Sequence, residues 1–406
     1  MERIVIIGSG QGGQQAASSL RQEGYQGQIL LLGEEPGLPY QRPPLSKAYM
    51  ANGDAGALTL KPASFYDRAA ISLQDRTRVN RIERATREVV TEAGARHAYD
   101  HLILATGARN FRPPIAGLDA PGVVELRTLS DAAHIRDRLA ATRHAVVIGG
   151  GFIGLEFAAM ARAAGVAVTV IEAAPRLMAR AVSPGMSARF LELHREMGSE
   201  VILDALADAI LHDPQGAAAG VALRYGRQIA GDLVLVATGV RPNVELAADA
   251  GLVCDNGIRV DGQLLTSDPA ISALGDVASF PDPDGVHIRL ESVQAAVDHA
   301  RHIARCLVHG SAADYAALPW FWSDQGKFKL QIAGLSTGAD RVMSLPQPQA
   351  EPLVLAFRAG RLIAVETLSA PALHMAGRRL ISASFEMLQA HGFDLRAAVK
   401  AMAEPV

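Results

Sequence analysis

The chain has 406 residues, of which 49% are hydrophobic and 20% are charged, and its net charge is −3. This length exceeds what one hydrophobic core usually supports, so we expect two or three domains. The charge gives no reason to expect nucleic-acid binding, and two distant cysteines, Cys254 and Cys306, exclude a disulfide framework and a cysteine metal cluster. No uncharged stretch has membrane length, so we expect a cytoplasmic protein without a membrane anchor.

The chain opens with a pattern typical of a dinucleotide-binding unit. Residues 3–7 predict a buried strand, because branched apolar residues run without interruption up to a glycine. A G-x-G-x-x-G motif follows, with its glycines at Gly8, Gly10 and Gly13. An alanine-rich helix pattern then leads to a second strand at 28–32 and to the acid Glu34. The unit closes with a strand, YDHLIL, that ends in a turn at Thr106 and Gly107.

The same order of elements returns in the middle of the chain. The second G-x-G-x-x-G motif has its glycines at Gly149, Gly151 and Gly154. A helix pattern continues through Ala164, and the following strand, VAVTVI, ends at the acid Glu172. The closing strand, LVLVATG, ends at Gly239.

The residue types of this repeated unit suit dinucleotide chemistry. The first glycine permits a tight turn, the second lets the backbone approach a pyrophosphate, and the third lets helix and strand pack closely. The acid after the second strand can accept hydrogen bonds from ribose hydroxyls. A single motif of this kind also serves plain packing. Two copies, each between a strand and a helix and followed by an acid, predict that two dinucleotides bind.

A later stretch, LGDVASF, places Asp276 after a short apolar strand. Together with other stretches before and after it, this stretch makes the chain resemble the oxygenase-coupled ferredoxin reductase family. The matching stretches run from residue 3 to about residue 335 and are GSGQGG, LPYQRPPLSKAYM, LILATGA, LRTLSDA, VVIGGGFIGLE, ATGVRPN, TSDPAISALGDVA, RLESVQAA and LPWFWSDQ. RPPLSK and PWFWSDQ are the specific ones, since the glycine motifs belong to a wider superfamily.

The resemblance implies that the first unit binds FAD, noncovalently, and that the second binds NADH. Besides the glycines of the first motif, the candidates for FAD contact are Gly12, Glu34, Arg42, Lys47, Val79, Thr106, Gly107, Arg127, Asp276, Val293 and Trp320. The remaining cofactor-binding candidates are Gly149, Gly151, Ile153, Gly154, Glu172, Gly239 and Glu291.

Physical roles can be assigned to some of these candidates. Glu34 suits the adenosine ribose, and Arg42 can offset the charge of a pyrophosphate. Asp276 suits a ribityl hydroxyl, caps a helix, or does both. Arg127 is either a flavin contact or an ordinary surface charge.

We expect an α/β fold with two Rossmann-like dinucleotide-binding domains, as in glutathione reductase, and a C-terminal α+β domain. The FAD-binding domain is split into 1–110 and 243–317, and the NADH-binding domain is inserted at 111–242. The third domain, 318–406, begins with alternating strands (KLQIAG, PLVLAF, LIAVET) and ends with helices. Its segment 375–402 predicts a nearly continuous helix, where the family commonly has an acidic, proline-containing stretch.

Lys47 and Glu156 are the candidate catalytic residues. Lys47 matches the family lysine beside the flavin, and Glu156 lies two residues beyond the last glycine of the second motif. A buried lysine is costly alone, and a paired glutamate lessens that cost. We therefore expect a pair that tunes the flavin and positions the nicotinamide. The alternative is a solvated loop lysine and a first-turn helix acid. Trp320 is either a core aromatic residue or part of an electron exit.

The resemblance implies an FAD-dependent NADH:ferredoxin oxidoreductase that feeds a monooxygenase or a ring-hydroxylating dioxygenase. Its partner would be a two-iron two-sulfur ferredoxin, docked at basic residues such as Arg301, Arg305, Lys327 and Lys329, and the chain would be a monomer or a homodimer. Disulfide reductases and thiol-dependent NADH oxidases are excluded, because RPPLSK lacks cysteine. Rubredoxin reduction, quinone reduction and a redox-sensing role like that of apoptosis-inducing factor remain as alternatives.

Overall fold

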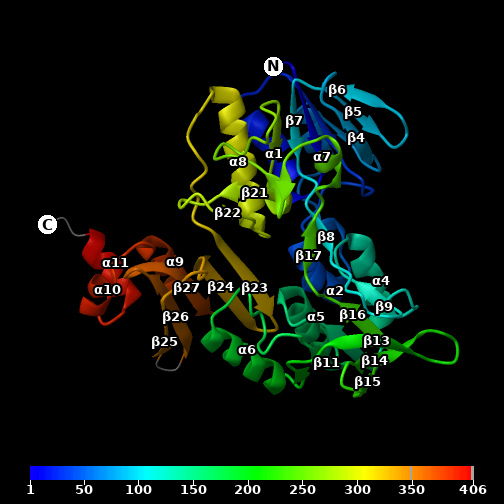
Figure 1. Cartoon of the computed structure of the whole chain (residues 1–406), viewed down its shortest axis with the longest axis vertical. Coiled ribbons are helices and arrows are strands. Elements are labelled where there is room, and N and C mark those ends of the chain that lie inside the picture. Colours follow the sequence, from blue (N-terminus) through cyan, green and yellow to red (C-terminus); the bar gives the residue numbers. More distant parts are fainter. Residues whose placement is uncertain (348–349, 404–406) are drawn as a thin grey trace. The chain divides into compact units, whose positions relative to one another are not determined.

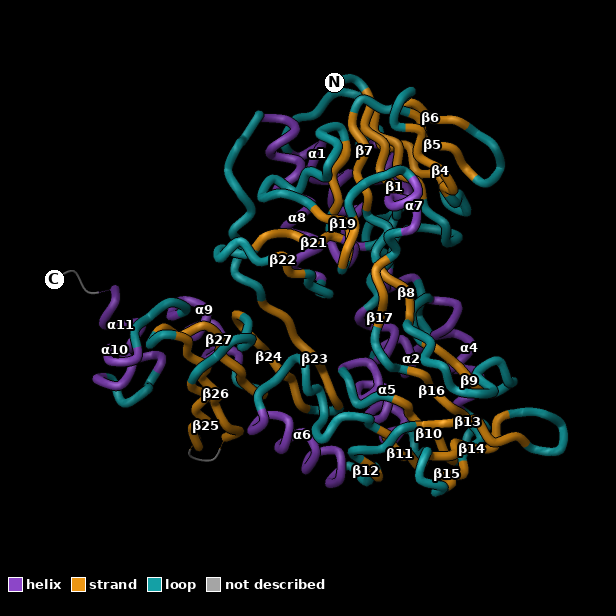
Figure 2. The backbone as a smooth tube through the Cα atoms, viewed as in Figure 1, coloured by secondary structure: helices purple, strands orange, loops and turns teal. Residues whose placement is uncertain are grey.

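The computed structural model describes residues 1–347 and 350–403 of the chain (Figures 1 and 2). These residues form two compact units. The first unit contains 1–42, 54–109 and 240–317, and the second contains 43–53, 110–239 and 318–406. Within the described part of the chain, every helix is too short or too polar to cross a membrane.

The first unit is built on a five-stranded parallel sheet. The strand order is β20-β7-β1-β2-β3, from Ile271–Ala273, His101–Leu104, Arg3–Ile7, Gln28–Leu32 and Ile71–Gln74. Helix α1, Gln11–Gln22, packs against β1 and β2 and against helix α8, Val293–His309. After the polar residue that begins each of them, the central strands β1, β2 and β7 are apolar, because both faces of the sheet are covered. The predicted strands at 3–7 and 28–32 are confirmed.

Two small sheets complete the first unit. One contains the antiparallel strands β4, β5 and β6, at Val79–Glu83, Glu88–Thr91 and Arg96–Ala98. The other contains β18, β19, β21 and β22, at Cys254–Asp255, Gly257–Arg259, Ala278–Pro281 and His287–Ile288. The shorter helices are η2, Gly56–Leu58, α3, Ala63–Arg68, α7, Glu245–Asp249, and η3, Gly275–Val277. Strand β17, Val240–Pro242, pairs with β8, Ala108–Asn110.

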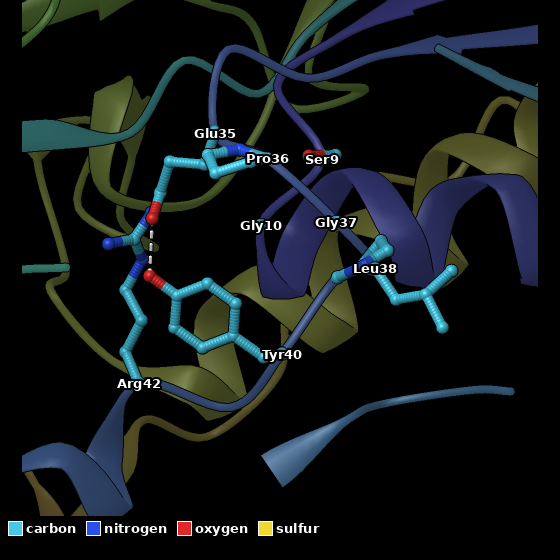
Figure 3. A pocket seen from close by; sticks show the side chains of 9 residues that line it. Ser9, Gly10, Glu35, Pro36, Gly37, Leu38, Tyr40 and Arg42 are labelled. Atoms are coloured by element: carbon cyan, nitrogen blue, oxygen red, sulfur yellow. Dashed lines mark hydrogen bonds and ion pairs between the residues drawn. The ribbon is translucent and has the colours of Figure 1, made fainter. Parts of the chain in front are cut away.

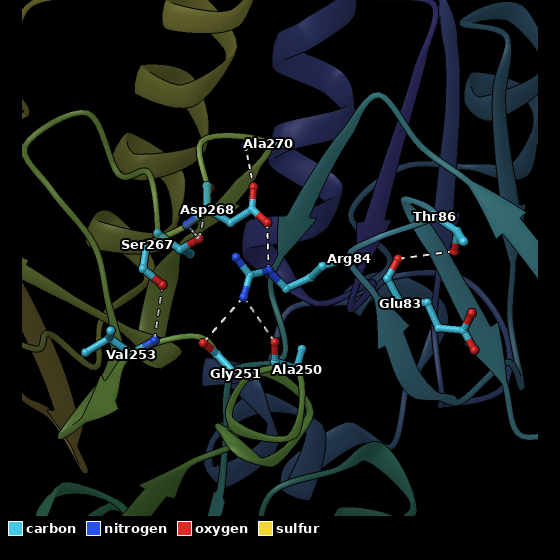
Figure 4. Close-up of polar contacts among 10 residues, drawn as sticks. Glu83, Arg84, Thr86, Ala250, Gly251, Val253, Ser267, Asp268 and Ala270 are labelled. Atoms are coloured by element: carbon cyan, nitrogen blue, oxygen red, sulfur yellow. Dashed lines mark hydrogen bonds and ion pairs between the residues drawn. The ribbon is translucent and has the colours of Figure 1, made fainter.

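One arginine joins the antiparallel strands to the segment that leads into β20 (Figure 4). Arg84 follows β4, and its Nε lies 2.7 Å from a carboxylate oxygen of Asp268. The Arg84 guanidinium also donates to the carbonyl of Ala250, at 3.3 Å. Asp268 accepts from the backbone amide of Ala270, one residue before β20. The arginine therefore fixes the edge strand of the parallel sheet through three separate chain segments.

The second unit contains another five-stranded parallel sheet with the same winding. The order is β12-β11-β10-β16-β9, from Glu200–Ile202, Ala167–Ile171, His144–Ile148, Leu233–Val236 and Val123–Glu125. Its helices are α4, Leu129–Leu139, α5, Phe152–Ala163, and α6, Pro184–Glu196. A three-stranded sheet contains β13, β14 and β15, at Ala207–His212, Ala218–Leu223 and Gln228–Ala230. The hydrogen bonds beside the two glycine motifs correspond, since Gly8 donates to Leu32 and Gly149 to Ile171, both at 2.8 Å.

The last part of the second unit is an antiparallel sheet covered by helices. Its order is β23-β24-β27-β26-β25, from Trp320–Gln325, Phe328–Gly334, Arg361–Leu368, Ala350–Arg358 and Arg341–Gln347. Helices α9, Pro371–Leu380, α10, Phe385–Ala390, and α11, Leu395–Ala403, supply the rest of its core. The predicted fold class is thus confirmed: two parallel-sheet Rossmann-like regions and a C-terminal antiparallel-sheet region.

The prediction of a nearly continuous helix over 375–402 is wrong. The chain leaves the helical conformation after Leu380, and Ser382 has a φ of +75°. The amide of Ser382 donates to the carbonyl of Leu362 on β27, so backbone bonding to the sheet replaces helical bonding. A second break lies at Gly392 and Phe393, both with φ near +60°. Helix periodicity alone does not reveal these breaks, because the apolar spacing continues across them.

The compact units differ from the predicted domains in two ways. The second unit combines the predicted NADH-binding and C-terminal domains, and it also contains one segment of the predicted FAD-binding domain. The segment 43–53, with η1, Pro43–Ser46, and α2, Ala48–Asn52, belongs to the second unit because it packs against α4 and α5. The division of the chain into domains at 110, 242 and 317 stays a prediction. Residues 404–406 of the predicted third domain lie outside the described residues.

The C-terminal core offers a matched test of packing. Leu380 on α9 is fully buried, whereas Met375 on the same helix is 50% exposed. We expect Leu380→Ala to destabilise this region by about 2–5 kcal/mol, because a buried leucine leaves a cavity. Met375→Ala should leave the thermal unfolding midpoint nearly unchanged. Differential scanning calorimetry of both variants checks this, and equal midpoints would contradict the packing of α9.

Candidate functional site

The first glycine motif forms a turn with no room for side chains at two of its positions. Gly8 has a φ of +105°, and a Cβ there would lie 2.2 Å from the carbonyl oxygen of Ala105. A Cβ on Gly13 would lie 1.8 Å from the carbonyl oxygen of Gly8. A Cβ on Gly10, in contrast, would meet no atom within 4 Å. Gly10 therefore faces open space at the beginning of α1.

The second motif repeats this geometry in the other unit. Gly149 has a φ of +114°, and a Cβ there would lie 2.3 Å from the carbonyl oxygen of Ala237. A Cβ on Gly154 would lie 2.1 Å from the carbonyl oxygen of Gly149. Gly151 again has open space around it. The two turns thus use their first and third glycines for packing and leave the second free for a ligand.

The helix N-termini at both turns fit a dinucleotide pyrophosphate. Gly10 and Gly151 are the N-caps of α1 and α5, and in the described chain neither helix has a side-chain cap or a first-turn acid. The first N–H groups of a helix lack intrahelical partners and lie at the positive end of its dipole. These groups are the donors that hold phosphates in such folds. The chain therefore offers an anion site in each unit.

Gly12 has a packing role in the structure. A Cβ there would lie 2.4 Å from a side-chain carbon of Leu274 and 3.5 Å from that of Ala296. Its small size lets α1 approach α8 and the end of β20 closely. The sequence predicted a contact with FAD at this position, and that contact stays a prediction.

A pocket in the first unit lies beside the turn of the first glycine motif (Figure 3). It is lined by Ser9, Gly10, Glu35, Pro36, Gly37, Leu38, Pro39, Tyr40 and Arg42. The Glu35 carboxylate pairs with the Arg42 guanidinium at 2.5 Å and accepts from the Tyr40 hydroxyl at 2.5 Å. Arg42 and Gly10, the N-cap of α1, thus line the same pocket, and the predicted role of Arg42 at a pyrophosphate stays a prediction. Glu35 and Tyr40 were not among the predicted site residues.

Glu34, the acid predicted to bind the adenosine ribose in the first unit, is not among the residues that line this pocket, and its ribose contact stays a prediction. The Glu34 side chain is 66% exposed and lies 3.6 Å from Arg78. In the second unit Glu172 directly follows β11, but the equivalent position after β2 is Gly33. A Cβ on Gly33 would lie 2.1 Å from the hydroxyl of Ser9, so no side chain fits there. The acids of the first unit are therefore displaced along the loop.

Glu172 is held by the backbone around the second motif. One carboxylate oxygen accepts from the amide of Gly150 at 2.6 Å, and the other accepts from the amide of Ala174 at 2.7 Å. A carboxylate has about four lone-pair sites, so acceptor capacity remains for a ribose. Ile153, the second residue of α5, is 43% exposed and so is open to a ligand.

The turns that end the two units, at Thr106-Gly107 and Thr238-Gly239, are each held by hydrogen bonds to another chain segment. In the first unit the Thr106 hydroxyl donates to the carbonyl of Asn243, and the Asn243 side chain donates back to the carbonyl of Thr106. In the second unit the Thr238 hydroxyl donates to the carbonyl of Phe111. Gly107 and Gly239 have φ of +65° and +104°, which the turns require. Asn243 is a further residue that sequence reasoning missed.

Asp276 lies in the short helix η3 of the first unit, beside the beginning of α8. Its carbonyl accepts from Arg289, whose guanidinium also lies 2.7 Å from Glu291. The preceding amide, of Gly275, donates to Nδ1 of His299, and burial lowers the pKa of this histidine to about 3. His299 is therefore neutral and accepts this bond. Val293 is the first residue of α8.

The remaining candidates lie at the ends of other elements. Val79 begins β4 and is 9% exposed. Arg127 immediately precedes Thr128, the N-cap of α4, and its amide donates to Asp131 in the capping box. Arg301 and Arg305 lie on α8 in the first unit, whereas Lys327 and Lys329 lie at the β23–β24 turn of the second.

Lys47 and Glu156 form the expected ion pair. The Lys47 ammonium lies 3.0 Å from the Glu156 carboxylate and 3.3 Å from that of Asp324. The Glu156 side chain is only 5% exposed, and it also accepts from the hydroxyls of Ser46 and Ser323 at 2.6 and 2.7 Å. Neither the two serines nor Asp324 was among the predicted site residues. Ser46 and Ser323 belong to RPPLSK and PWFWSDQ, but their meeting depends on the fold.

Trp320 belongs to an aromatic cluster on the C-terminal sheet. Its ring stacks on Trp322, with centroids 5.5 Å apart, and the Arg378 guanidinium lies 5.0 Å from the Trp320 ring. Cys254 and Cys306 are separate free thiols, and burial raises the pKa of each. The chain therefore presents no redox-active cysteine pair within its described residues.

Two uncapped glycine turns in parallel sheets define a protein with two dinucleotide sites, and comparison with known proteins places it among the oxidoreductases. Residues 2–300 match the pyridine nucleotide-disulphide oxidoreductase family, and residues 320–403 match the reductase C-terminal family. The chain belongs to the pyridine nucleotide-disulphide oxidoreductase family, which implies binding of FAD and NAD(P)H.

Several relatives are similar over nearly the whole chain. Rhodocoxin reductase of Rhodococcus erythropolis is 46% identical, covering 98% of this chain and 94% of its own. The ferredoxin reductase for the CYP199A2 system of Rhodopseudomonas palustris is 43% identical, with coverage of 98% and 100% and a TM-score of 0.94. The reductase in the covalent putidaredoxin reductase–putidaredoxin complex is 36% identical, with coverage of 99% of each chain and a TM-score of 0.94. The predicted family resemblance is confirmed.

The glycine geometry predicts opposite outcomes for two substitutions in one motif. Gly154→Ala should destabilise the second unit, because its Cβ would overlap the carbonyl oxygen of Gly149. Gly151→Ala should keep the stability, since its φ of −83° suits alanine and its Cβ meets no atom. It should nevertheless weaken nucleotide binding roughly tenfold, because the pyrophosphate must approach this position. Thermal unfolding and NAD⁺ titration measure both effects, and unchanged nucleotide affinity in Gly151→Ala would contradict the assignment.

Proposed function

We propose that the chain is an FAD-dependent NADH:ferredoxin oxidoreductase. Its partner is a two-iron two-sulfur ferredoxin that feeds a monooxygenase or a ring-hydroxylating dioxygenase. The carrying observation is the pair of equivalent glycine turns, each with an open second glycine and an uncapped helix N-terminus. The proposed partner is supported by the relatives, which are reductases of rhodocoxin, of putidaredoxin and of a ferredoxin.

The residues of the first unit suit noncovalent binding of FAD. The α1 terminus offers amide donors to the pyrophosphate, and Arg42, oriented by Glu35, adds positive charge. The Thr106-Gly107 turn and Asp276 lie after β7 and β20, at the carboxyl ends of parallel strands. In open parallel sheets this edge is where ligands bind. The chemistry that bound FAD would supply is acceptance of a hydride from the nicotinamide and release of the two electrons one at a time.

The residues of the second unit suit NADH. The α5 terminus serves the pyrophosphate, and Glu172 accepts hydrogen bonds from the adenosine ribose. A 2′-phosphate in the same place would meet the carboxylate and be repelled. Ala173 and Ala174 follow Glu172 and supply no basic side chain that would hold this phosphate. We therefore assign NADH as the preferred donor.

Lys47 and Glu156 have the charges that electron transfer needs. The Lys47 ammonium offers a fixed positive charge where the resemblance places the flavin, and negative charge develops there on reduction. Glu156 holds this ammonium at 3.0 Å and lowers the cost of burying it. Cysteine takes no part in this scheme, since Cys254 and Cys306 belong to neither glycine turn nor to this pair.

An acceptor assay tests the proposed function. The purified protein should be yellow and should release FAD on heating. It should reduce cytochrome c with NADH only when a two-iron two-sulfur ferredoxin is added. Added salt should slow this reaction, because docking to an acidic carrier is steered by charge. A rubredoxin and a quinone serve as comparison acceptors. Fast turnover with a quinone, a rubredoxin or oxygen, and none with any ferredoxin, would overturn the proposal.

Nucleotide preference is tested by a neutral isostere of Glu172. Glu172→Gln should lower the ratio of kcat/KM for NADH over NADPH by roughly tenfold, because repulsion of the 2′-phosphate is lost. Glu200→Gln is the matched control, since Glu200 begins the neighbouring strand β12 and pairs with Arg227. An unchanged ratio in Glu172→Gln would show that another residue selects the nucleotide.

A further inference from the structure

The Glu156 carboxylate is almost fully buried, yet both of its oxygens accept hydrogen bonds. It receives the Ser46 hydroxyl on one oxygen, and the Ser323 hydroxyl and the Lys47 ammonium on the other. Ser46 and Lys47 come from RPPLSK, but Ser323 comes from β23 of the C-terminal sheet. A buried charge is tolerated only when such partners satisfy it. The C-terminal sheet is therefore part of the environment of the Lys47–Glu156 pair.

The direction of the Ser323 hydrogen bond is fixed by two buried neighbours. Nε2 of His194 lies 2.8 Å from the Gln325 side-chain oxygen, an acceptor, so His194 carries its proton on Nε2. The Gln325 side-chain amide then donates to the Ser323 oxygen at 3.2 Å. The Ser323 proton is left to point at Glu156, 2.7 Å away. His194, Ser323 and Gln325 are all fully buried, so water does not compete for these bonds.

Asp324, the next residue on β23, contacts Lys47 directly. Its carboxylate oxygens lie 3.3 Å from the Lys47 ammonium and 3.3 Å from that of Lys329. Successive residues of a strand usually point to opposite faces. Near the end of β23, however, Ser323 contacts Glu156 and Asp324 contacts Lys47, so both residues reach the pair. Ser323 thus holds Glu156, and Asp324 holds Lys47.

We propose that Ser323 and Asp324 are positioning residues, supplied by the C-terminal sheet, that fix the Lys47–Glu156 pair in its working geometry. This inference rests on the proposed function of the pair in flavin reduction. RPPLSK and α5 supply the two charges of the pair, Lys47 and Glu156, and the contacts from β23 fix the positions of these charges.

Chemical labelling of Lys47 tests the inference without measuring turnover. Trace acetylation of the flavin-loaded full chain, read by peptide mass spectrometry, reports how freely the Lys47 amine leaves its partners. Lys400, exposed on α11, is the internal reference. Asp324→Asn should raise Lys47 labelling by about tenfold, the effect of losing one hydrogen bond to a charged group. Ser323→Ala should raise it less, because Glu156 keeps Ser46.

The matched control is Asp119→Asn, which makes the same substitution at an exposed ion pair with Arg112. It should leave Lys47 labelling unchanged. Flavin content and thermal midpoint of each variant establish that the chain has folded. Equal Lys47 labelling in the parent chain and in Asp324→Asn and Ser323→Ala would overturn the inference, since β23 would then not hold the pair.

Stopped-flow reduction separates positioning from plain structural support. Asp324→Asn should slow flavin reduction at saturating NADH by about tenfold, with the NADH dissociation constant changed less than about twofold. Ser323→Thr, which keeps the hydroxyl, should restore what Ser323→Ala loses. A loss confined to NADH affinity would contradict a positioning role. If Lys47→Ala leaves reduction unchanged while the labelling results hold, the proposed role of the pair fails and the positioning geometry stands.

Discussion

The close approach of the third glycine to the first, at Gly13 on Gly8 and at Gly154 on Gly149, is the contact on which both nucleotide sites depend. It brings the first turn of the helix onto the carboxyl end of its strand, at a distance that no Cβ permits. The helix N-terminus is thereby fixed where the strand order reverses, and its amides point into the space that the second glycine leaves open. Any larger residue would tilt the helix and move the anion site with it.

Much of this arrangement could be predicted from the sequence, because its determinants are local. A short apolar run that ends in glycine specifies both the strand and the turn, as the strands at 3–7 and 28–32 show. Repetition of the whole unit then makes the winding of the second sheet follow from the first. The ion pair of Lys47 and Glu156 was also predicted, but only through the family resemblance, since over a hundred residues separate the two.

The features that escaped prediction depend on tertiary contacts. Glu35 rather than Glu34 reaches the pocket, because Gly33 packs on Ser9 and shifts the acids along the loop. The helical spacing after Met375 gave no sign that Ser382 would bond to β27 and break the helix. Periodicity reports which residues face a core, but it does not report which backbone groups find partners outside their own element.

The C-terminal sheet contacts helices α5 and α6 through buried polar groups as well as apolar side chains. Glu156 on α5 accepts from Ser323 on β23, and Glu366 on β27 accepts from the amide and hydroxyl of Ser183, the N-cap of α6. Burial raises the pKa of Glu366, while the two Ser183 donors and the charge of Arg176 oppose this rise by favouring the ionised form. Removing one partner of a buried charge typically costs about 3–5 kcal/mol, far more than loss of an exposed pair. The sheet and the two helices therefore keep one relative placement, and the hydrogen bonds that set this placement include those that hold Glu156 against Lys47.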